Sequence, residues 1–169
     1  MNDEQTYAVV GGRGTMTVFE IYIKTSPERL WEAITDAEMR KRYSFGVGIE
    51  SDWKAGSEYL ARVPGVVDIS SGENVEVDPP RRLVQSFDAL WSEDVRSEGT
   101  TRVTWEIDPV GEDSSRVRVT HDQLREAANS ELWGGWPMIL SGLKTLLETG
   151  EDLTTPASLM YEGAARQGG

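Results

Sequence analysis

The feature that most constrains the fold is a run of strand-like segments between residues 47 and 122 that contains no helical repeat. Apolar and polar residues alternate within the segments, and short stretches rich in Gly, Pro, Asp and Ser separate them. We expect six strands here: Val47–Trp53, Ser57–Val63, Val66–Val77, Arg82–Leu90, Thr100–Pro109 and Ser115–Gln123. Because consecutive strands joined by short turns pair antiparallel, this run favours an α+β fold with an antiparallel sheet over a doubly wound parallel sheet.

Further elements flank this run. Residues 17–24 alternate as one more strand. Ser26-Pro27-Glu28-Arg29 then has the composition of a helix start, with a serine cap, a proline at the first helical position and an acid in the first turn. A second short helix is expected over Thr35–Tyr43. The predicted order is therefore a strand, two short helices, the run of strands and one long helix.

The long helix is expected over residues 130–149, where large apolar residues recur at helical spacing and form one apolar stripe. Gly150 follows the stripe directly, at the place of a left-handed cap. Pro137 marks either the true start of this helix or a kink within it.

Two features of this helix are unusual for a core element. Trp133 and Trp136 flank the pair Gly134-Gly135 at its entrance, and Gly142 lies inside the stripe. A glycine there costs about 1 kcal/mol relative to alanine. We therefore interpret the segment as a helix that covers a space, with the tryptophans at the rim and Gly142 leaving room beneath it.

Length and composition set the domain organisation and the cellular setting. At 169 residues the chain fits one domain, expected over residues 15–152, with a flexible arm at 1–14 and a loosely attached tail at 153–169. It has no cysteine, and its acidic N-terminus does not resemble a signal peptide, so we expect a cytoplasmic protein.

Charge and motifs exclude several classes of function. The formal net charge of −12 argues against nucleic acid and against anionic membrane surfaces as partners. With one histidine and no cysteine the chain lacks the residues of a zinc site, and nucleotide-binding motifs are absent, so we expect neither a metal nor a cofactor. The charge leaves a basic protein partner or a neutral small molecule open; of these we expect a small hydrophobic ligand, and we expect the chain to be a monomer or a homodimer.

A series of short motifs in a fixed order resembles the START-like (SRPBCC) superfamily. Within it, the chain looks like the family named after the C-terminal domain of the activator of Hsp-ninety ATPase. The motifs are Ser26-Pro27-Glu28-Arg29-Leu30-Trp31, Asp78-Pro79-Pro80-Arg81-Arg82-Leu83, Val103–Ile107, Val117–His121 and Gly135-Trp136-Pro137 with Leu143-Lys144 and Leu147–Gly150. The resemblance implies a helix-grip fold, in which a curved antiparallel sheet grips the C-terminal helix and leaves an apolar cavity between them.

Strand parity predicts which side chains face this cavity. On the strand at 115–123, Val117 and Val119 are apolar, which places His121 on the same inner face. A histidine there could act as a base or contact a ligand. A hydrogen-bonded polar residue is the simpler interpretation, because neither a nucleophile nor an orienting group stands beside it in the sequence.

Aromatic residues provide the other candidates for ligand contacts. Trp133 and Trp136 are expected at the cavity rim, whereas Trp105 fits core filling better than ligand binding. By parity the strand at 82–90 turns an inner set toward the cavity. The full candidate set for ligand binding is Trp133, Trp136, Gly142, Trp105, Phe87, Gln85, Trp91, Tyr59 and His121.

Three functions follow from these expectations. The first is a binding domain for a small hydrophobic or aromatic ligand. The second, suggested by the family name, is a co-chaperone-like activator of an Hsp-ninety ATPase, although the sequence lacks the separate N-terminal domain of the eukaryotic activators. The third is a cyclase or hydrolase type of enzyme that uses His121. No residue set in the sequence establishes catalysis.

Overall fold

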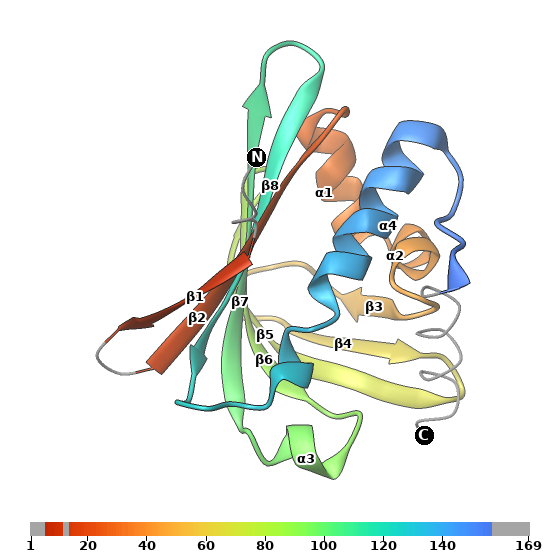
Figure 1. The fold of residues 1–169 in the computed structure, drawn as a ribbon. Coiled ribbons are helices and arrows are strands. Elements are labelled where there is room, and N and C mark those ends of the chain that lie inside the picture. The colour runs from red at the N-terminus through yellow and green to blue at the C-terminus, as the bar shows by residue number, and fades with distance from the viewer. Residues whose placement is uncertain (1–5, 12–13, 157–169) are drawn as a thin grey trace.

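The computed structural model describes residues 6–11 and 14–156, and these residues form one eight-stranded antiparallel sheet with helices packed on it (Figure 1). The order of strands across the sheet is β1-β2-β8-β7-β6-β5-β4-β3. The strands are β1 (Thr6–Gly11), β2 (Gly14–Ile23), β3 (Gly48–Ser51), β4 (Glu58–Val63), β5 (Val67–Asp78), β6 (Arg82–Ala89), β7 (Thr100–Val110) and β8 (Ser114–Leu124). The helices are α1 (Pro27–Thr35), α2 (Ala37–Tyr43), α3 (Glu93–Arg96), the 3-10 helix η1 (Ser130–Leu132) and α4 (Trp136–Thr149).

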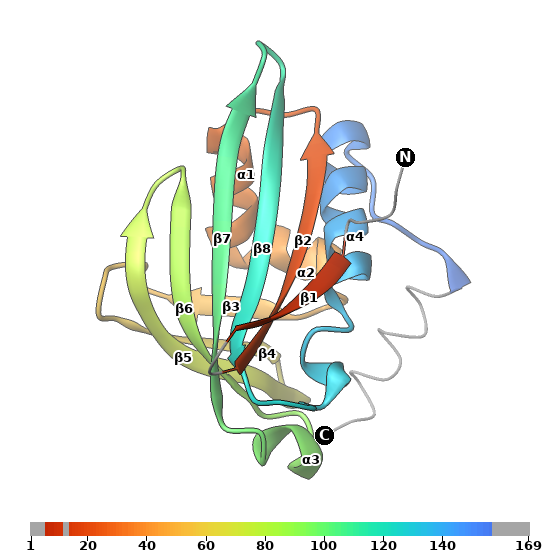
Figure 2. The same ribbon diagram turned by 60° about the vertical axis from the view of Figure 1, so that its left-hand side comes forward.

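Helices α1, α2 and α4 lie together on one face of the sheet (Figures 1 and 2). The sheet curves, so that β3 lies beside α2, and the long strands β7 and β8 pass in front of the helices in Figure 2. This arrangement is the helix grip that the strand order and the family resemblance predicted, and the predicted α+β class is confirmed.

The helix boundaries follow from local sequence. The Ser26 side chain caps α1 by accepting a hydrogen bond from the Arg29 backbone N–H at 3.2 Å. The segment expected as one helix over residues 130–149 is instead η1 followed by α4, with Pro137 in the first turn of α4. The proline therefore marks the true start of the helix rather than a kink. Gly150 ends it with a φ of 79°, as expected for a left-handed cap.

All six strands of the central run form, within a few residues of their expected bounds. Two elements were missed. Ser92 caps the short helix α3, which lies in a connection expected to be a turn. Part of the expected N-terminal arm is strand β1, which pairs along β2 from Thr6 opposite Phe19 to Gly11 opposite Gly14. The backbone of β2 thereby gains partners for its outer hydrogen-bonding groups, which explains why this part of the arm is ordered as strand.

The expectations for the outermost parts of the chain lie largely outside the described residues. These parts are residues 1–5, 12–13 and 157–169, which include most of the expected tail. The domain limits of 15–152 therefore stay a prediction.

The core lies between the inner face of the sheet and the helices, and the parity prediction for the inner residues of β8 is correct. Val103, Trp105 and Ile107 on β7 are at most 2% exposed, and Val117 and Val119 on β8 are fully buried. The apolar stripe of α4 packs onto them through its buried residues Trp136, Leu140, Leu143 and Leu146.

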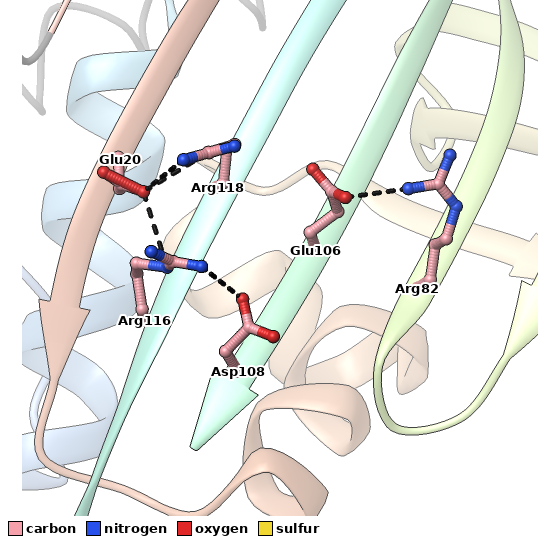
Figure 3. Close-up of polar contacts among 6 residues, drawn as sticks. All are labelled: Glu20, Arg82, Glu106, Asp108, Arg116 and Arg118. Atoms are coloured by element: carbon pink, nitrogen blue, oxygen red, sulfur yellow. Dashed lines mark hydrogen bonds and ion pairs between the residues drawn. The ribbon is translucent and has the colours of Figure 1, made fainter. Parts of the chain in front are cut away.

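The outer face of the sheet carries charged residues that pair across neighbouring strands (Figure 3). On β8, Arg118 lies 3.0 Å from Glu20 of β2, and Arg116 lies 2.7 Å from Asp108 of β7. Arg116 also lies 3.4 Å from Glu20, so this acid joins two arginines. A further pair links β6 and β7 through Arg82 and Glu106 at 2.8 Å. We call these six residues, Glu20, Arg82, Glu106, Asp108, Arg116 and Arg118, the outer ion-pair ladder.

Candidate functional site

A cavity of about 570 Å³ lies between the curved sheet, the end of α2 with the turn after it, and the segment that leads into α4. Small-molecule sites usually have volumes of about 300–1,000 Å³, so the cavity has the size of a ligand site. Most of its lining side chains are apolar: Phe45, Val47, Ala61, Val67, Ile69, Phe87, Trp91, Leu132, Trp136 and Ile139.

Four aromatic side chains line the cavity, Phe45, Phe87, Trp91 and Trp136, and the last three are placed by β6 and α4. Trp136 is the first residue of α4 and is 7% exposed, and its ring meets the buried Trp105 edge-on with centroids 5.5 Å apart. Phe87 projects from β6, and Trp91 follows the end of that strand. The Trp91 indole Nε1 donates to the Glu131 carboxylate at 3.4 Å, which joins two residues of the lining. The wall therefore offers flat apolar surfaces suited to an aromatic or aliphatic ligand.

A hydrogen-bonded chain lies behind this wall and includes His121. The Trp136 indole Nε1 donates to His121 Nδ1 at 3.4 Å, and His121 Nε2 lies 2.8 Å from Thr101 Oγ1. Because an indole N–H can only donate, Nδ1 must accept and the proton of the neutral imidazole must sit on Nε2. The Thr101 hydroxyl then donates to the Phe87 carbonyl oxygen at 3.3 Å. Every polar atom of the imidazole therefore has a partner.

Burial keeps His121 uncharged. The residue is fully buried, and this desolvation lowers the pKa of its imidazole to about 4, against a weaker opposing effect of Asp122. The ring also meets Phe87 edge-on, with centroids 5.0 Å apart. His121 thus contacts two members of the cavity wall, Phe87 and Trp136, without lining the cavity itself. This geometry supports a hydrogen-bonded positioning residue and offers no free ring nitrogen for general-base catalysis.

Arg40 brings a positive charge to the cavity. It lies in the last turn of α2, and its side chain is among those that line the space. Its Nη1 donates to the Ile34 carbonyl oxygen at 3.0 Å and its Nε to Ser44 Oγ at 3.3 Å. The guanidinium carbon stands 5.6 Å from the Trp105 ring centroid and 5.8 Å from that of Tyr43. Two buried aromatic rings and two neutral acceptors therefore hold this cation in place.

Of the nine residues expected to contact a ligand, the cavity lining includes Phe87, Trp91 and Trp136. The other six lie elsewhere. Trp105 is 1% exposed and fills the core behind Trp136, as the composition argument favoured. Trp133 is half-buried and packs against two core clusters, although its neighbours in the chain line the cavity. His121 lies in the second layer described above.

The two expected polar contacts, Tyr59 and Gln85, are bonded within the protein. The Tyr59 hydroxyl donates to the Ser86 carbonyl oxygen at 2.7 Å, and burial raises its pKa well above the usual range. Gln85 donates to the Asn74 side chain at 2.9 Å, and Asn74 in turn donates to Ser51 and Ser57. Both residues are buried, and neither belongs to the lining of the cavity.

Gly142 does not leave the space that the sequence analysis expected beneath the helix. A Cβ atom placed on it would lie 3.1 Å from the Tyr43 carbonyl oxygen and 3.3 Å from the Tyr43 Cβ. The glycine therefore lets α4 approach α2 closely, and the volume it frees is filled by α2. The absence of a side chain at Gly142 thus serves helix packing, and the expectation of ligand space beneath α4 at this residue is wrong.

Sequence reasoning missed the polar part of the lining. Arg40, Ser44 and Ser70 all face the cavity, and both serines are 4% exposed. One signal could have identified Arg40: it precedes Tyr43 by three residues on a helix, so the two side chains share a face. The run Arg40-Lys41-Arg42 instead suggests a solvated basic turn.

Within residues 6–11 and 14–156, no three His, Asp or Glu side chains come together as a metal site requires. None of the helices in this described part is long and apolar enough to cross a membrane.

The family model of the Activator of Hsp90 ATPase homolog 1-like protein matches residues 24–148. The chain belongs to this family. The match runs from the end of β2 to the last turn of α4 and contains all the elements around the cavity. The resemblance to the START-like superfamily is thereby confirmed.

Solved structures agree with this assignment at the level of the fold. The crystal structure of CalU16 from Micromonospora echinospora is 19% identical, covers 97% of this chain and 95% of its own, and has a TM-score of 0.69. An HSP90 activator from Plasmodium falciparum is 25% identical over 77% of this chain and 95% of its own, with a TM-score of 0.62. The Aha1 dimer from Colwellia psychrerythraea is 23% identical over 79% and 96%, with a TM-score of 0.63. A comparison with curated proteins gave no match.

Proposed function

We propose that this domain binds a small hydrophobic or aromatic molecule in the cavity between its sheet, the end of α2 and the start of α4. The observation that carries the proposal is the cavity of about 570 Å³, with an aromatic wall formed by Phe87, Trp91 and Trp136. The wall is supported from behind by hydrogen bonds and ring contacts of His121. A preformed, supported apolar space is what a small-molecule site requires.

A neutral fluorescent probe tests this proposal. N-phenyl-1-naphthylamine gains fluorescence in apolar surroundings, and we expect saturable binding that chemically diverse apolar compounds displace. Ala61→Phe adds a ring to the lining and should weaken probe binding at least tenfold, while Leu60→Phe adds the same ring on the other side of β4 and should not. Absence of saturable probe binding to the folded wild-type protein would refute the proposal.

Activation of an Hsp90-type chaperone is a second candidate function. It is favoured by membership of the Activator of Hsp90 ATPase homolog 1-like family and by the fold shared with an HSP90 activator from Plasmodium falciparum. The direct test is the ATPase rate of the chaperone from the same organism, measured with increasing amounts of this protein. An unchanged rate at saturation removes this candidate and leaves ligand binding untouched.

The remaining expectations are kept as predictions. A cytoplasmic location is suggested by the absence of cysteine, and a monomer or homodimer stays the expected oligomeric state. The solved structure from Colwellia psychrerythraea is described as a dimer, so light scattering of this protein over a range of concentrations is the relevant measurement. An enzymatic role for His121 is not proposed, because both ring nitrogens are occupied.

A further inference from the structure

The charged side chains in the cavity lining differ in their exposure and in their bonding partners. Arg40 and Glu131 are the two charged residues in the lining of the described structure. Glu131 is exposed and already accepts a hydrogen bond from the Trp91 indole. Arg40 is half-buried, and among the described residues no carboxylate lies within 4.0 Å of its nitrogens. The cavity therefore contains a cation that this part of the protein does not neutralise.

The donors of Arg40 are only partly used. A guanidinium has five N–H donors. In the described structure Nη1 donates to the Ile34 carbonyl oxygen and Nε to Ser44 Oγ, and both acceptors are neutral. Further donors remain for a molecule in the cavity, and the contacts with the Trp105 and Tyr43 rings keep the group from swinging away. The hydroxyls of Ser44 and Ser70 lie in the same lining.

That no carboxylate within the described part of the chain pairs with Arg40 is notable in so acidic a protein. Acidic residues number 29 against 17 lysines and arginines, so a carboxylate is the side chain most easily supplied. The neighbours of Arg40 on the same helix do have partners: Lys41 lies 3.0 Å from Glu38, and Arg42 lies 2.9 Å from Asp152. A partly buried cation is costly without a counter-ion, and the ring contacts offset only part of that cost. A bound anion would supply what is missing.

We propose that the ligand of this cavity is an amphipathic acid, an apolar or aromatic body with one carboxylate, and that the carboxylate binds Arg40. The inference rests on the proposed ligand-binding function and names the chemical class of its ligand. Arginine suits this role because its planar donor fork matches the two oxygens of a carboxylate. The apolar body of the ligand lies against Phe87, Trp91 and Trp136.

The test compares acids with alcohols of the same shape. Dodecanoic acid is paired with dodecanol, and 2-naphthoic acid with 2-naphthalenemethanol, each as a competitor for N-phenyl-1-naphthylamine at pH 7.4 and below micelle-forming concentrations. A charge-assisted hydrogen bond contributes about 1.5–3 kcal/mol, so the wild type should prefer each acid roughly 10- to 100-fold. Raised salt should reduce the preference only modestly, because the site is partly buried.

Three variants isolate the role of Arg40. Arg40→Met should bring the acid-to-alcohol ratio close to one, and Arg40→Lys should leave an intermediate ratio, because the charge stays while the fork is lost. Arg42→Met removes an equal charge from the exposed side of the same helix and should leave the wild-type ratio unchanged. Circular dichroism and thermal unfolding establish that each variant is folded, and Arg40→Lys answers the question if Arg40→Met does not fold.

The two proposals fail in different ways. If the probe and the alcohols bind but the acids show no preference, or if Arg40→Met keeps the preference, the inference about Arg40 is overturned and ligand binding stands. If neither the neutral probe nor any competitor binds the folded wild type, the ligand-binding function itself is overturned.

Discussion

On the outer face of the sheet, Arg82, Arg116 and Arg118 each lie within 3.4 Å of a carboxylate on a neighbouring strand (Figure 3). In the cavity on the inner side, Arg40 contacts two aromatic rings and two neutral oxygens instead. The charges of the outer arginines are therefore neutralised by carboxylates of the protein itself. Among the described residues the inner arginine has no carboxylate partner, which fits the proposal that it binds the carboxylate of a ligand.

The same contrast extends from charge to packing. The inner face is held by burial of large apolar side chains against α1, α2 and α4, whereas the outer face is held by exposed or half-exposed ion pairs. Burial contributes kilocalories per side chain, and a solvent-exposed ion pair contributes fractions of one. Substitutions on the two faces should therefore differ greatly in their effect on stability.

The largest effect is expected from removing an inner aromatic ring. Trp105→Ala deletes a side chain that is 1% exposed and packs edge-on against Trp136, so it should lower the free energy of unfolding by about 3–5 kcal/mol. The matched outer variant is Tyr22→Ala, at a side chain that is 55% exposed, with an expected loss of about 0.5 kcal/mol. Urea unfolding of both variants measures the difference, and equal losses would contradict the contrast between the faces.

Acid should weaken the inner face through His121. Its pKa is about 4 in the folded protein and about 6.5 when exposed, so the unfolded chain binds the extra proton first. Above pH 6.5 His121 is neutral in both the folded and the unfolded chain, and acid does not yet weaken the fold through it. As the pH drops from 7 to 4, the preferred protonation of the unfolded chain lowers the free energy of unfolding by about 3 kcal/mol.

The control for this prediction is His121→Gln, which does not titrate and can still accept from Trp136 and donate to Thr101. Unfolding free energies of both proteins are measured from pH 7 to pH 4. The unfolding free energy of the wild type minus that of His121→Gln should fall by the same amount between pH 7 and pH 4, while the many surface carboxylates affect both proteins alike. Parallel curves would mean that His121 is not kept neutral by burial.

Close packing between helices on the inner side leads to a smaller effect. Gly142→Val adds a branched side chain whose Cβ would lie only 3.1 Å from the Tyr43 carbonyl oxygen. The substitution should lower the free energy of unfolding by about 1–3 kcal/mol. Ser141→Val, on the exposed side of the same turn, should change stability by less than about 0.5 kcal/mol. A stabilising Gly142→Val, measured by thermal unfolding, would show that α4 does have free space beneath it after all.

Gly142 and Arg40 show which features of the site could not be predicted from the sequence. The order of strands along the chain, the Ser26 cap and the inner positions of Val117 and Val119 follow from alternation and capping, which are local properties. A bare patch on a helix, by contrast, suits either a ligand or another helix, and only the three-dimensional position of α2 decides between them. The same holds for Arg40, whose neighbours in one basic run pair with surface acids while it alone turns to the cavity.

His121 shows the same limit from another side. Parity placed it correctly on the inner face, where it is fully buried. Its partners Trp136 and Thr101 are 15 and 20 residues away in the sequence, so the hydrogen bonds that occupy both ring nitrogens could not be inferred. Positions within a strand are readable from local pattern, whereas contacts between distant segments depend on how the whole sheet curves.

The smallest effect is expected on the outer face itself, and it tests whether the outer ion-pair ladder contributes anything beyond solubility. A double-mutant cycle with Glu20→Gln and Arg118→Met isolates one pair, whose charged groups lie 3.0 Å apart and are 29% and 41% exposed. Exposed pairs of this kind couple by about 0.2–1 kcal/mol, and salt reduces the coupling because the charges face solvent. Since Glu20 also reaches Arg116, part of its charge stays paired when Arg118 is removed, which keeps the measured coupling at the lower end of that range. A coupling above about 2 kcal/mol that persists in high salt would mean that an outer ion pair stabilises the fold as much as a buried side chain does. The proposed difference in stability between the two faces would then be wrong.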